Sequence, residues 1–330
     1  MKIAILGNGG FGTAMALALH RAGHGVSLWG HDPVYTAQIA AMRQNPRYLD
    51  GVALPDAIRV AHHAGAVLDR AELVLLAVPT QHVRGVLTTV GPHLAADVPI
   101  VSLAKGLEQG SARRPSEVVA EVLGGPGRVF VLSGPSHAEE IARDLPTTVV
   151  LAGHDDAELR RLQAALTTPA FRVYRNRDVL GTELCGALKN VMALAAGIAD
   201  GLGYGDNAKA AILSRGIVEM LRYGQGLGAD PRTFFGLAGV GDLAVTAFSA
   251  HGRNRAFGER IGRGETLAQA LAASPKVAEG VWTARVVVDE AQRRQVEMPI
   301  AQAVVRVLHE GLSPRDAVRE LMERDPKSEA

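Results

Sequence analysis

The feature of this sequence that most constrains its fold is a glycine-rich segment near the N-terminus, Gly7-Asn8-Gly9-Gly10-Phe11-Gly12. It follows the short β-rich run 2–6 and leads directly into the helix-like run 13–19. In this setting Gly7 permits a tight turn, Gly9 lets the backbone approach a pyrophosphate, and Gly12 allows close packing of helix against strand. The helix N-terminus then faces the negative charge. The segment predicts dinucleotide binding, and a glycine-rich turn in an unrelated α/β protein is the alternative.

Short β-rich runs alternate with helical patterns over the first half of the chain. We expect strands at residues 2–6, 25–29, 71–78, 98–103, 129–132, 147–152 and 171–174. Apolar strands separated by amphipathic helices are typical of a parallel sheet covered on both faces. From 182 to 321 the chain offers helical patterns broken by glycine-rich joints. The expected fold is α/β, with an N-terminal Rossmann-type doubly wound parallel sheet (residues 1–180) and a C-terminal all-α domain (residues 181–330).

The length of 330 residues suits two domains, and the composition argues against several classes of function. A net charge of +1, without a block of Lys and Arg, argues against nucleic acid as a partner. The N-terminal apolar run is too short for a signal peptide, and no apolar stretch predicts stable membrane insertion. The single cysteine, Cys185, is consistent with a reducing compartment. We therefore expect a soluble, cytoplasmic protein.

The end of the second expected strand, Trp29-Gly30-His31-Asp32, bears on the choice of cofactor. NAD-specific sites of this type place a carboxylate on the ribose 2′-hydroxyl, and Gly30 stands at that place with the acid displaced to Asp32. Without a carboxylate there is less repulsion against a 2′-phosphate, which His31 is able to approach. NADP is therefore expected to be tolerated, and NAD remains open. A solvated loop imidazole is the alternative reading of His31.

Lysine is rare in this chain, since only six of the 35 cationic Lys and Arg residues are lysines. Lys189 lies in an apolar helical segment with no other charge between Glu183 and Asp200. Burial lowers the pKa of an ammonium group toward the range of proton transfer, and a guanidinium could not give up its proton. We predict a catalytic role for Lys189. The alternatives are a lysine that reaches the surface or one that is buried in an ion pair.

Two further regions suggest a small anionic substrate. Lys105 follows an apolar strand, which brings its ammonium to the carboxyl edge of the sheet, unless it pairs with Glu108 instead. The segment 133–139 turns from a strand into a helix start and presents free N–H groups. Arg253, in the run Arg253-Asn254-Arg255, is suited to grip a phosphate, and Asp242 to orient Lys189. Together these residues predict reduction of a phosphorylated ketone.

In their order and spacing these segments resemble those of the bacterial-type NAD(P)-dependent glycerol-3-phosphate dehydrogenases, over nearly the whole chain. The resemblance is carried by residues 7–12, 28–32, 105–108, 133–136, 188–190, 239–242, 253–255 and 277–280. It implies reversible hydride transfer between NAD(P)H and dihydroxyacetone phosphate, which gives sn-glycerol 3-phosphate for phospholipid synthesis. It also implies an enzyme that is commonly a homodimer, and no metal is expected.

The resemblance also assigns roles to residues. It makes Lys189 the proton donor to the C2 oxygen on reduction and the proton acceptor on oxidation. The positions that it implies for substrate binding, besides Lys189, are Lys105, Gly134, Ser136, Asp242, Arg253 and Asn254. Those that it implies for binding NADP or NAD are Gly10, Phe11, His31, Lys105, Ala138, Arg253, Val277 and Glu279.

One departure from the family pattern affects the substrate site. The serine that usually precedes Arg-Asn is Gly252 here, so a hydroxyl is lost and at most the backbone N–H of Gly252 is left to meet a phosphate. Two alternative functions remain at this point. A small hydroxy-acid dehydrogenase of the same architecture should need a carboxylate site rather than a phosphate clamp. A non-catalytic NAD(P)-binding regulator would not need a lysine in an uncharged helix.

Overall fold

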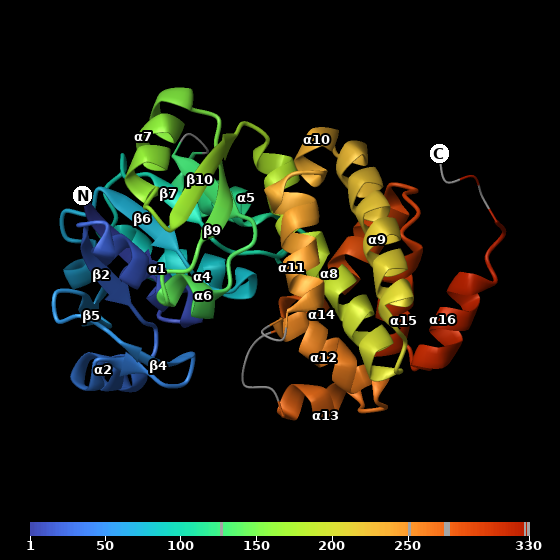
Figure 1. Cartoon of the computed structure of the whole chain (residues 1–330). Coiled ribbons are helices and arrows are strands. Elements are labelled where there is room, and N and C mark those ends of the chain that lie inside the picture. The colour runs from blue at the N-terminus through green and yellow to red at the C-terminus, as the bar shows by residue number, and fades with distance from the viewer. Residues whose placement is uncertain (126–127, 250–251, 274–277, 327, 329–330) are drawn as a thin grey trace.

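The structure is a computed structural model that describes residues 1–125, 128–249, 252–273, 278–326 and 328. Figure 1 shows an α/β half built from the N-terminal part of the chain beside a helical half built from the C-terminal part. This is the expected fold class. The helix that begins the second half starts at Val179, where the Asp178 carboxylate accepts a hydrogen bond from the Gly181 N–H at 2.8 Å. The expected domain boundary near residue 180 remains a prediction.

The α/β half is built on an eight-stranded sheet with the strand order β10-β9-β8-β7-β6-β1-β2-β5. Its strands are β1 (Lys2–Leu6), β2 (Gly25–Trp29), β5 (Arg59–Ala61), β6 (Leu73–Leu76), β7 (Ile100–Ser102), β8 (Val129–Ser133), β9 (Thr147–Ala152) and β10 (Phe171–Asn176). All seven expected strands are present. β5 and the small hairpin of β3 (Gln44–Asn45) and β4 (Leu49–Ala53) were not predicted from the sequence.

The sheet is parallel, as expected, except at one pair of strands. β8 and β9 are antiparallel, with Leu132 opposite Leu151, and β10 pairs in parallel with β9. The short helix α6 (Ala138–Ala142) packs against α1 (Gly10–Arg21) instead of crossing a face of the sheet. The chain therefore begins β9 at the end of the sheet where β8 finishes, and β9 runs antiparallel to β8.

Helices cover both faces of the sheet, as a doubly wound fold requires. The remaining helices of this half are α2 (Pro33–Met42), α3 (Ala64–Leu68), η1 (Thr80–His82), α4 (Val83–Val90), η2 (Gly91–His93), α5 (Pro115–Leu123) and α7 (Asp156–Leu166). Ile3 and Ile5 belong to one hydrophobic cluster and Ala4 and Leu6 to another. Successive side chains of β1 therefore point to opposite, equally buried faces.

The glycine-rich turn after β1 has the geometry that the sequence predicts. Gly7 has a φ of +121°, and a Cβ atom on it would lie 2.6 Å from the carbonyl oxygen of Ala77. A Cβ on Gly12 would lie 1.9 Å from the carbonyl oxygen of Gly7. A side chain on Gly7 would push the turn away from the loop that follows β6, and one on Gly12 would push α1 away from the turn, so the close packing here depends on these two glycines.

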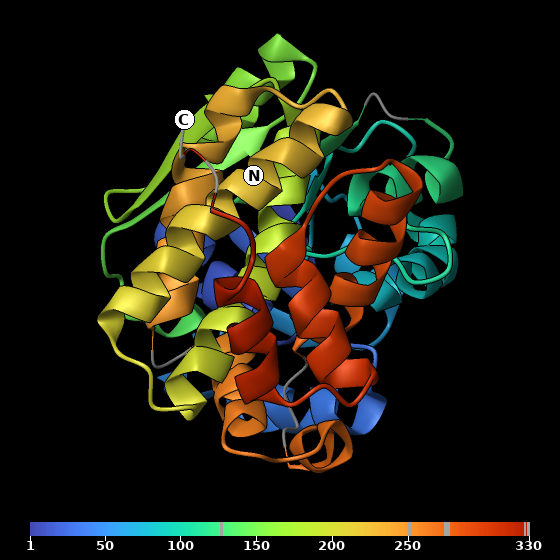
Figure 2. The ribbon, with the colours of Figure 1, turned by 90° about the vertical axis from the view of Figure 1, so that its right-hand side faces the viewer.

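The helical half surrounds one long central helix, α8 (Val179–Gly201), and no strand occurs in its described residues. The other helices are α9 (Asp206–Gly226), α10 (Pro231–Phe234), η3 (Leu237–Gly241), α11 (Asp242–Phe248), α12 (Arg253–Gly262), α13 (Leu267–Ala272), α14 (Glu279–Arg293), α15 (Pro299–His309) and α16 (Pro314–Met322). Figure 2 views this half from its outer side, in front of the sheet. The expected all-α second half is confirmed.

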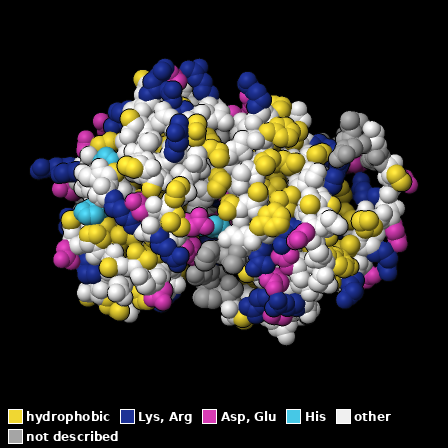
Figure 3. All heavy atoms as spheres, in the orientation of Figure 1, with side chains coloured by type: hydrophobic (Ala, Val, Ile, Leu, Met, Phe, Trp, Pro, Cys, Tyr) yellow, Lys and Arg dark blue, Asp and Glu magenta, His cyan; other side chains and the backbone are white. Residues whose placement is uncertain are grey.

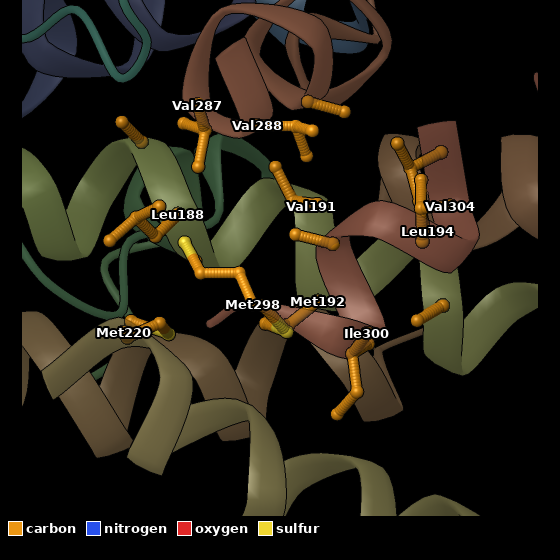
Figure 4. Close-up of a cluster of buried hydrophobic side chains, with 14 of the residues drawn as sticks. Leu188, Val191, Met192, Leu194, Met220, Val287, Val288, Met298, Ile300 and Val304 are labelled. Atoms are coloured by element: carbon orange, nitrogen blue, oxygen red, sulfur yellow. The ribbon is translucent and has the colours of Figure 1, made fainter. Parts of the chain in front are cut away.

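The core of the helical half forms where neighbouring helices pack on α8. Figure 4 shows Leu188, Val191 and Met192 of α8 packed with Val287 and Val288 of α14. By length and apolar composition α8 would also suit a membrane span, but it is buried inside the protein. Its hydrophobicity therefore belongs to a core helix, and a charged residue on it is necessarily removed from water.

Candidate active site

Lys189, the single charged residue in the middle of α8, has a side chain that is only 7% exposed. Its Nζ donates hydrogen bonds to Asp242 Oδ1 at 2.6 Å and to Thr246 Oγ1 at 2.7 Å. Three residues earlier, a Cβ on Gly186 would lie 3.1 Å from Ser133 Oγ, so α8 passes close to the end of β8. Lys189 is therefore held at the junction of the two halves and does not reach the surface.

Lys105 approaches the same carboxylate from the α/β half. It follows β7 at the carboxyl edge of the sheet, and its Nζ donates to Asp242 Oδ2 at 2.8 Å, to the carbonyl oxygen of Gly134 at 3.0 Å and to Ser136 Oγ at 3.3 Å. The alternative pairing of Lys105 with Glu108 is wrong, because Glu108 forms a two-fold hydrogen-bonded ion pair with Arg84. We call Lys105, Asp242 and Lys189 the lysine–aspartate bridge.

The position of Asp242 follows from the start of α11. The π-helical turn η3 brings the chain to Asp242, the first residue of α11, and buries its side chain to 2% exposure. One turn later, Thr246 Oγ1 donates to the Asp242 carbonyl oxygen at 2.6 Å and accepts from Lys189. Each carboxylate oxygen of Asp242 thus receives one ammonium group. The sequence prediction that Asp242 orients Lys189 agrees with this geometry.

The electrostatics of the bridge favour a lysine that can change its charge. Burial lowers the pKa of Lys189 from 10.5 to about 7, and the positive charges of Lys105 and Arg253 act in the same direction. The carboxylate of Asp242 opposes the shift. Burial alone would raise the pKa of Asp242, but the two ammonium groups lower it below its ordinary value. The carboxylate therefore stays ionised while Lys189 is able to gain and lose a proton near neutral pH.

A chain of buried amides links the bridge to the rest of the helical half. Asn190 Nδ2 donates to the carbonyl oxygen of Lys105 at 2.9 Å, and Asn190 Oδ1 accepts from Asn254 Nδ2 at 2.9 Å. Asn254 Oδ1 in turn accepts from the Gly280 N–H at 3.0 Å. Asn254, which the resemblance assigns to substrate, is thus buried with its amide engaged in this chain.

Arg253 differs from its buried neighbour Asn254. It is the first residue of α12 and is exposed, and its side chain forms no hydrogen bond or ion pair with the described residues. Its positive charge nevertheless favours a lower pKa of both Lys189 and Glu279, although burial raises the pKa of Glu279 overall. A guanidinium without a partner among the described residues is suited to bind a small anion.

Gly252 is adapted to a close turn before α12. A Cβ on Gly252 would lie 2.6 Å from the carbonyl oxygen of Thr246, so the serine usual in the family would not fit this backbone without a shift. The Gly252 N–H donates to the carbonyl oxygen of Ser249 at 3.1 Å. The N–H that the sequence analysis left for a phosphate is therefore already engaged.

Comparison with known proteins decides the family. The model of the NAD-dependent glycerol-3-phosphate dehydrogenase N-terminus matches residues 2–159, and that of the C-terminus of the same family matches residues 178–319. The chain belongs to the NAD-dependent glycerol-3-phosphate dehydrogenase family. A glycerol-3-phosphate dehydrogenase [NAD(P)+] of Chlorobium limicola is 46% identical over 331 residues, covering 100% of this chain and 99% of the relative.

Other members of the glycerol-3-phosphate dehydrogenase family agree over the full length. The enzyme of that name from Streptomyces griseus is 47% identical, with 100% of this chain and 98% of the relative covered. A crystal structure of glycerol-3-phosphate dehydrogenase from Coxiella burnetii has a TM-score of 0.93 at 41% identity and covers 98% of this chain and 99% of that one. The resemblance inferred from the sequence motifs is therefore confirmed, and both halves share the family's architecture.

The polar atoms between the two halves of this dehydrogenase fit a dinucleotide. Glu279, in the first turn of α14, accepts from the Thr80 N–H at 3.0 Å through Oε1. Its Oε2, with Thr80 Oγ1 and Thr283 Oγ1, is buried without a hydrogen-bond partner among the described residues. All three oxygens converge on Gly106, where a Cβ would lie 2.5 to 3.2 Å from them. Buried polar atoms left unpaired in this way are suited to a polar ligand group.

The remaining predicted cofactor residues come from four separate segments of the chain. Gly10 and Phe11 begin α1, and a Cβ on Gly10 would lie 3.7 Å from the Cβ of Ala138, the first residue of α6. His31 is exposed in the loop after β2. Val277 lies outside the described residues.

Three polar residues of the site were not predicted from the sequence. They are Asn190, Thr246 and Thr283, all buried. Asn190 directly follows Lys189, and Thr246 lies one helical turn after Asp242. An uncharged polar side chain next to a predicted catalytic residue, or one turn away from it, is the signal that could have found these two.

Proposed function

We propose that this chain catalyses the reversible reduction of dihydroxyacetone phosphate to sn-glycerol 3-phosphate with NAD(P)H. The lysine–aspartate bridge carries this proposal, since it holds a buried lysine with a pKa of about 7 at the carboxyl edge of a dinucleotide-binding sheet. A lysine that is protonated in part at neutral pH suits a proton transfer that runs in both directions.

In the proposed reaction, bound NAD(P)H supplies the hydride that is added to C2 of the ketone. Lys189 donates a proton from Nζ to the C2 oxygen as negative charge develops there, and becomes a neutral amine. In the reverse direction, the amine takes the proton from the C2 hydroxyl group. Asp242 and Thr246 keep Nζ in place through their hydrogen bonds. The ammonium of Lys105 adds a second fixed positive charge that stabilises the developing oxyanion.

We assign the phosphate of the substrate to Arg253. Its guanidinium is exposed, has no partner among the described residues and lies close enough to lower the pKa of Lys189. Gly134 and Ser136, which contact Lys105 Nζ, form the opposite side of the proposed substrate site. Asn254 contributes by holding Asn190 and the start of α14 in place.

For the cofactor, we assign the pyrophosphate to the glycine-rich turn and the N-terminus of α1. This proposed pyrophosphate site is lined by the first residues of that helix, Gly10 and Phe11, and by the neighbouring Ala138. Glu279, with Thr80 and Thr283, is assigned to a polar group at the nicotinamide end, because their oxygens are buried and unpaired in the described part of the chain.

Family membership also supports a cellular setting, which we include in the proposal. The product would enter phospholipid synthesis, and the enzyme would work in the cytoplasm as a homodimer. Figure 3 shows hydrophobic side chains gathered over the helical half. Among the exposed large ones are Phe235, Val240 and Phe248, which lie between α10 and the end of α11. Exposed apolar side chains that gather in this way favour a second protein surface.

A panel of substrates tests the proposed function. We expect oxidation of NADPH or NADH with dihydroxyacetone phosphate to be far faster than with unphosphorylated dihydroxyacetone or with small keto acids. Equal or faster turnover of a keto acid would favour a hydroxy-acid dehydrogenase. Absence of turnover with every compound, in a folded protein that binds cofactor, would favour a regulator.

A further inference from the structure

The end of β2 cannot carry the carboxylate that binds a ribose 2′-hydroxyl in NAD-specific sites. Gly30 directly follows β2. A Cβ on Gly30 would lie 2.1 Å from Asn8 Nδ2 and 2.2 Å from Thr36 Oγ1. These two side chains are hydrogen-bonded to each other and buried, so an acidic residue at position 30 would need both to move.

The next acidic residue in the sequence after Gly30 is Asp32, which is the N-cap residue of α2. Its Oδ1 accepts hydrogen bonds from the Val34 N–H at 3.0 Å and the Tyr35 N–H at 3.1 Å, which caps the helix. The bond from Tyr35, together with the positive charges of His31 and Arg47, holds the pKa of Asp32 below its ordinary value. Two basic side chains therefore lie near the segment that follows β2, although Arg47 comes from a more distant part of the sequence.

That distant residue, Arg47, lies in the turn between β3 and β4. Its guanidinium carbon stacks 4.2 Å from the centre of the Tyr35 ring and 5.9 Å from that of Tyr48. Its backbone N–H donates to Tyr35 Oη at 3.0 Å. The guanidinium itself forms no hydrogen bond or ion pair within the described residues, and the residue is exposed. Stacking fixes the plane of the group and leaves the N–H groups at its edge open.

The turn that carries Arg47 is tied to the glycine-rich loop. Tyr35 Oη donates to Asn45 Oδ1 at 2.6 Å, and Asn45 Nδ2 donates to the carbonyl oxygen of Asn8 at 2.8 Å and to Thr13 Oγ1 at 2.7 Å. All of these side chains except the exposed Arg47 are buried. The place of Arg47 relative to the proposed pyrophosphate site is therefore fixed before any ligand binds.

We propose that Arg47, with His31, binds the 2′-phosphate of the adenosine moiety of NADP(H) and gives this chain a preference for NADP(H) over NAD(H). A guanidinium matches a phosphate through two parallel hydrogen bonds, and an arginine near the end of the second strand is one way in which Rossmann sites accept NADP. The proposal rests on the placement of the pyrophosphate at the glycine-rich turn, as given under the proposed function.

The test compares two ligands that differ only by the 2′-phosphate, adenosine 2′,5′-bisphosphate and adenosine 5′-monophosphate. Their affinities are measured by calorimetry for the wild-type protein and for Arg47→Ala. Arg175→Ala, which removes another exposed arginine at the opposite edge of the sheet, on β10, is the matched control. Thermal unfolding shows whether each variant remains folded.

We expect the wild type and Arg175→Ala to bind the bisphosphate at least about ten-fold more tightly than the monophosphate. Arg47→Ala should lose this difference, while its affinity for the monophosphate stays unchanged. Equal affinity of the wild type for both ligands would overturn the proposal, as would an equal loss of both affinities in Arg47→Ala.

The same data separate this inference from the proposed function. If neither ligand binds the wild type, the assignment of the pyrophosphate to the glycine-rich turn fails, and the inference fails with it. If both bind equally and dihydroxyacetone phosphate is still reduced with NADH and NADPH, only the role of Arg47 is overturned.

Discussion

Lys105 and Lys189 share one carboxylate, although they belong to different halves of the molecule. Lys105 Nζ lies 2.8 Å from Asp242 Oδ2, and Lys189 Nζ lies 2.6 Å from Asp242 Oδ1. Two ammonium groups this close to one buried carboxylate leave an excess of positive charge at the site. That excess favours an anionic substrate and a developing oxyanion, and it helps to keep the pKa of Lys189 low.

The ionisation of Lys189 should give the two directions of the reaction opposite pH dependences. Its pKa of about 7 means that the ammonium form dominates at lower pH and the amine at higher pH. Reduction needs the ammonium and oxidation needs the amine. We therefore expect kcat/KM for reduction to fall, and that for oxidation to rise, as pH increases through about 7. Initial rates measured in both directions check this, and a change of the same sign in both would contradict it.

The variant Asp242→Asn tests whether Lys189 controls these pH profiles. The carboxylate raises the pKa of Lys189, so its replacement by a neutral amide should lower that pKa further. Both pH profiles should move to lower pH, and reduction at neutral pH should slow. An unshifted profile would mean that another group controls the proton transfer.

Arg253→Ala tests the proposed phosphate site. Loss of a charged hydrogen-bonding partner should raise KM for dihydroxyacetone phosphate by about 10- to 100-fold. The slow reaction of unphosphorylated dihydroxyacetone should change little, since it lacks the phosphate that we assign to Arg253. Steady-state kinetics with both substrates make the comparison. If the variant changes the kinetics of both substrates equally, or of neither, then another residue binds the phosphate.

Glu219 should control stability rather than catalysis. It lies on α9, and its carboxylate accepts from the Ile300 and Ala301 N–H groups at the start of α15. Glu219→Ala leaves these buried donors unpaired, so the free energy of unfolding should fall by about 2–3 kcal/mol without loss of kcat in the folded protein. Urea titration followed by enzyme assay measures both.

The raised pKa of Glu219 also predicts the direction in which the free energy of unfolding changes with pH. Burial raises the pKa of Glu219 from 4.5 to about 7, so the folded state binds more protons than the unfolded state between these values. Its contribution to stability is therefore greatest below pH 4.5 and is lost as pH rises through about 7. Glu219→Gln should flatten this part of the stability profile. A profile equally steep in wild type and variant would assign the effect to other groups.

The parts of the fold that depend on local pattern could be predicted from the sequence. The glycine-rich turn has one backbone solution, and the apolar runs mark the central strands. β5 and the hairpin of β3 and β4 are short and partly exposed, so they lack that pattern. The direction of β9 depends on where α6 packs, which is a tertiary contact that no local signal encodes.

The residues of the site can be divided in the same way, into those that the local sequence pattern reveals and those that only the tertiary structure reveals. Lys189 and Lys105 were found because a charge in an apolar setting is costly and therefore informative. Asn190 and Thr246 are neutral, so they become conspicuous only through their position next to Lys189 and one helical turn after Asp242. Arg47 acts, in our proposal, beside the end of β2, yet it lies on a separate hairpin. Only the folded chain places it over Tyr35.

The proposed reaction depends most directly on the proton transfer by Lys189. The decisive measurement is kcat for reduction of dihydroxyacetone phosphate by Lys189→Ala and Lys189→Arg, with NADPH binding followed by fluorescence. Arginine keeps the positive charge but cannot give up its proton. We predict that both variants lose at least about 100-fold in kcat while NADPH still binds. A kcat near that of the wild type in either variant would contradict the role of Lys189.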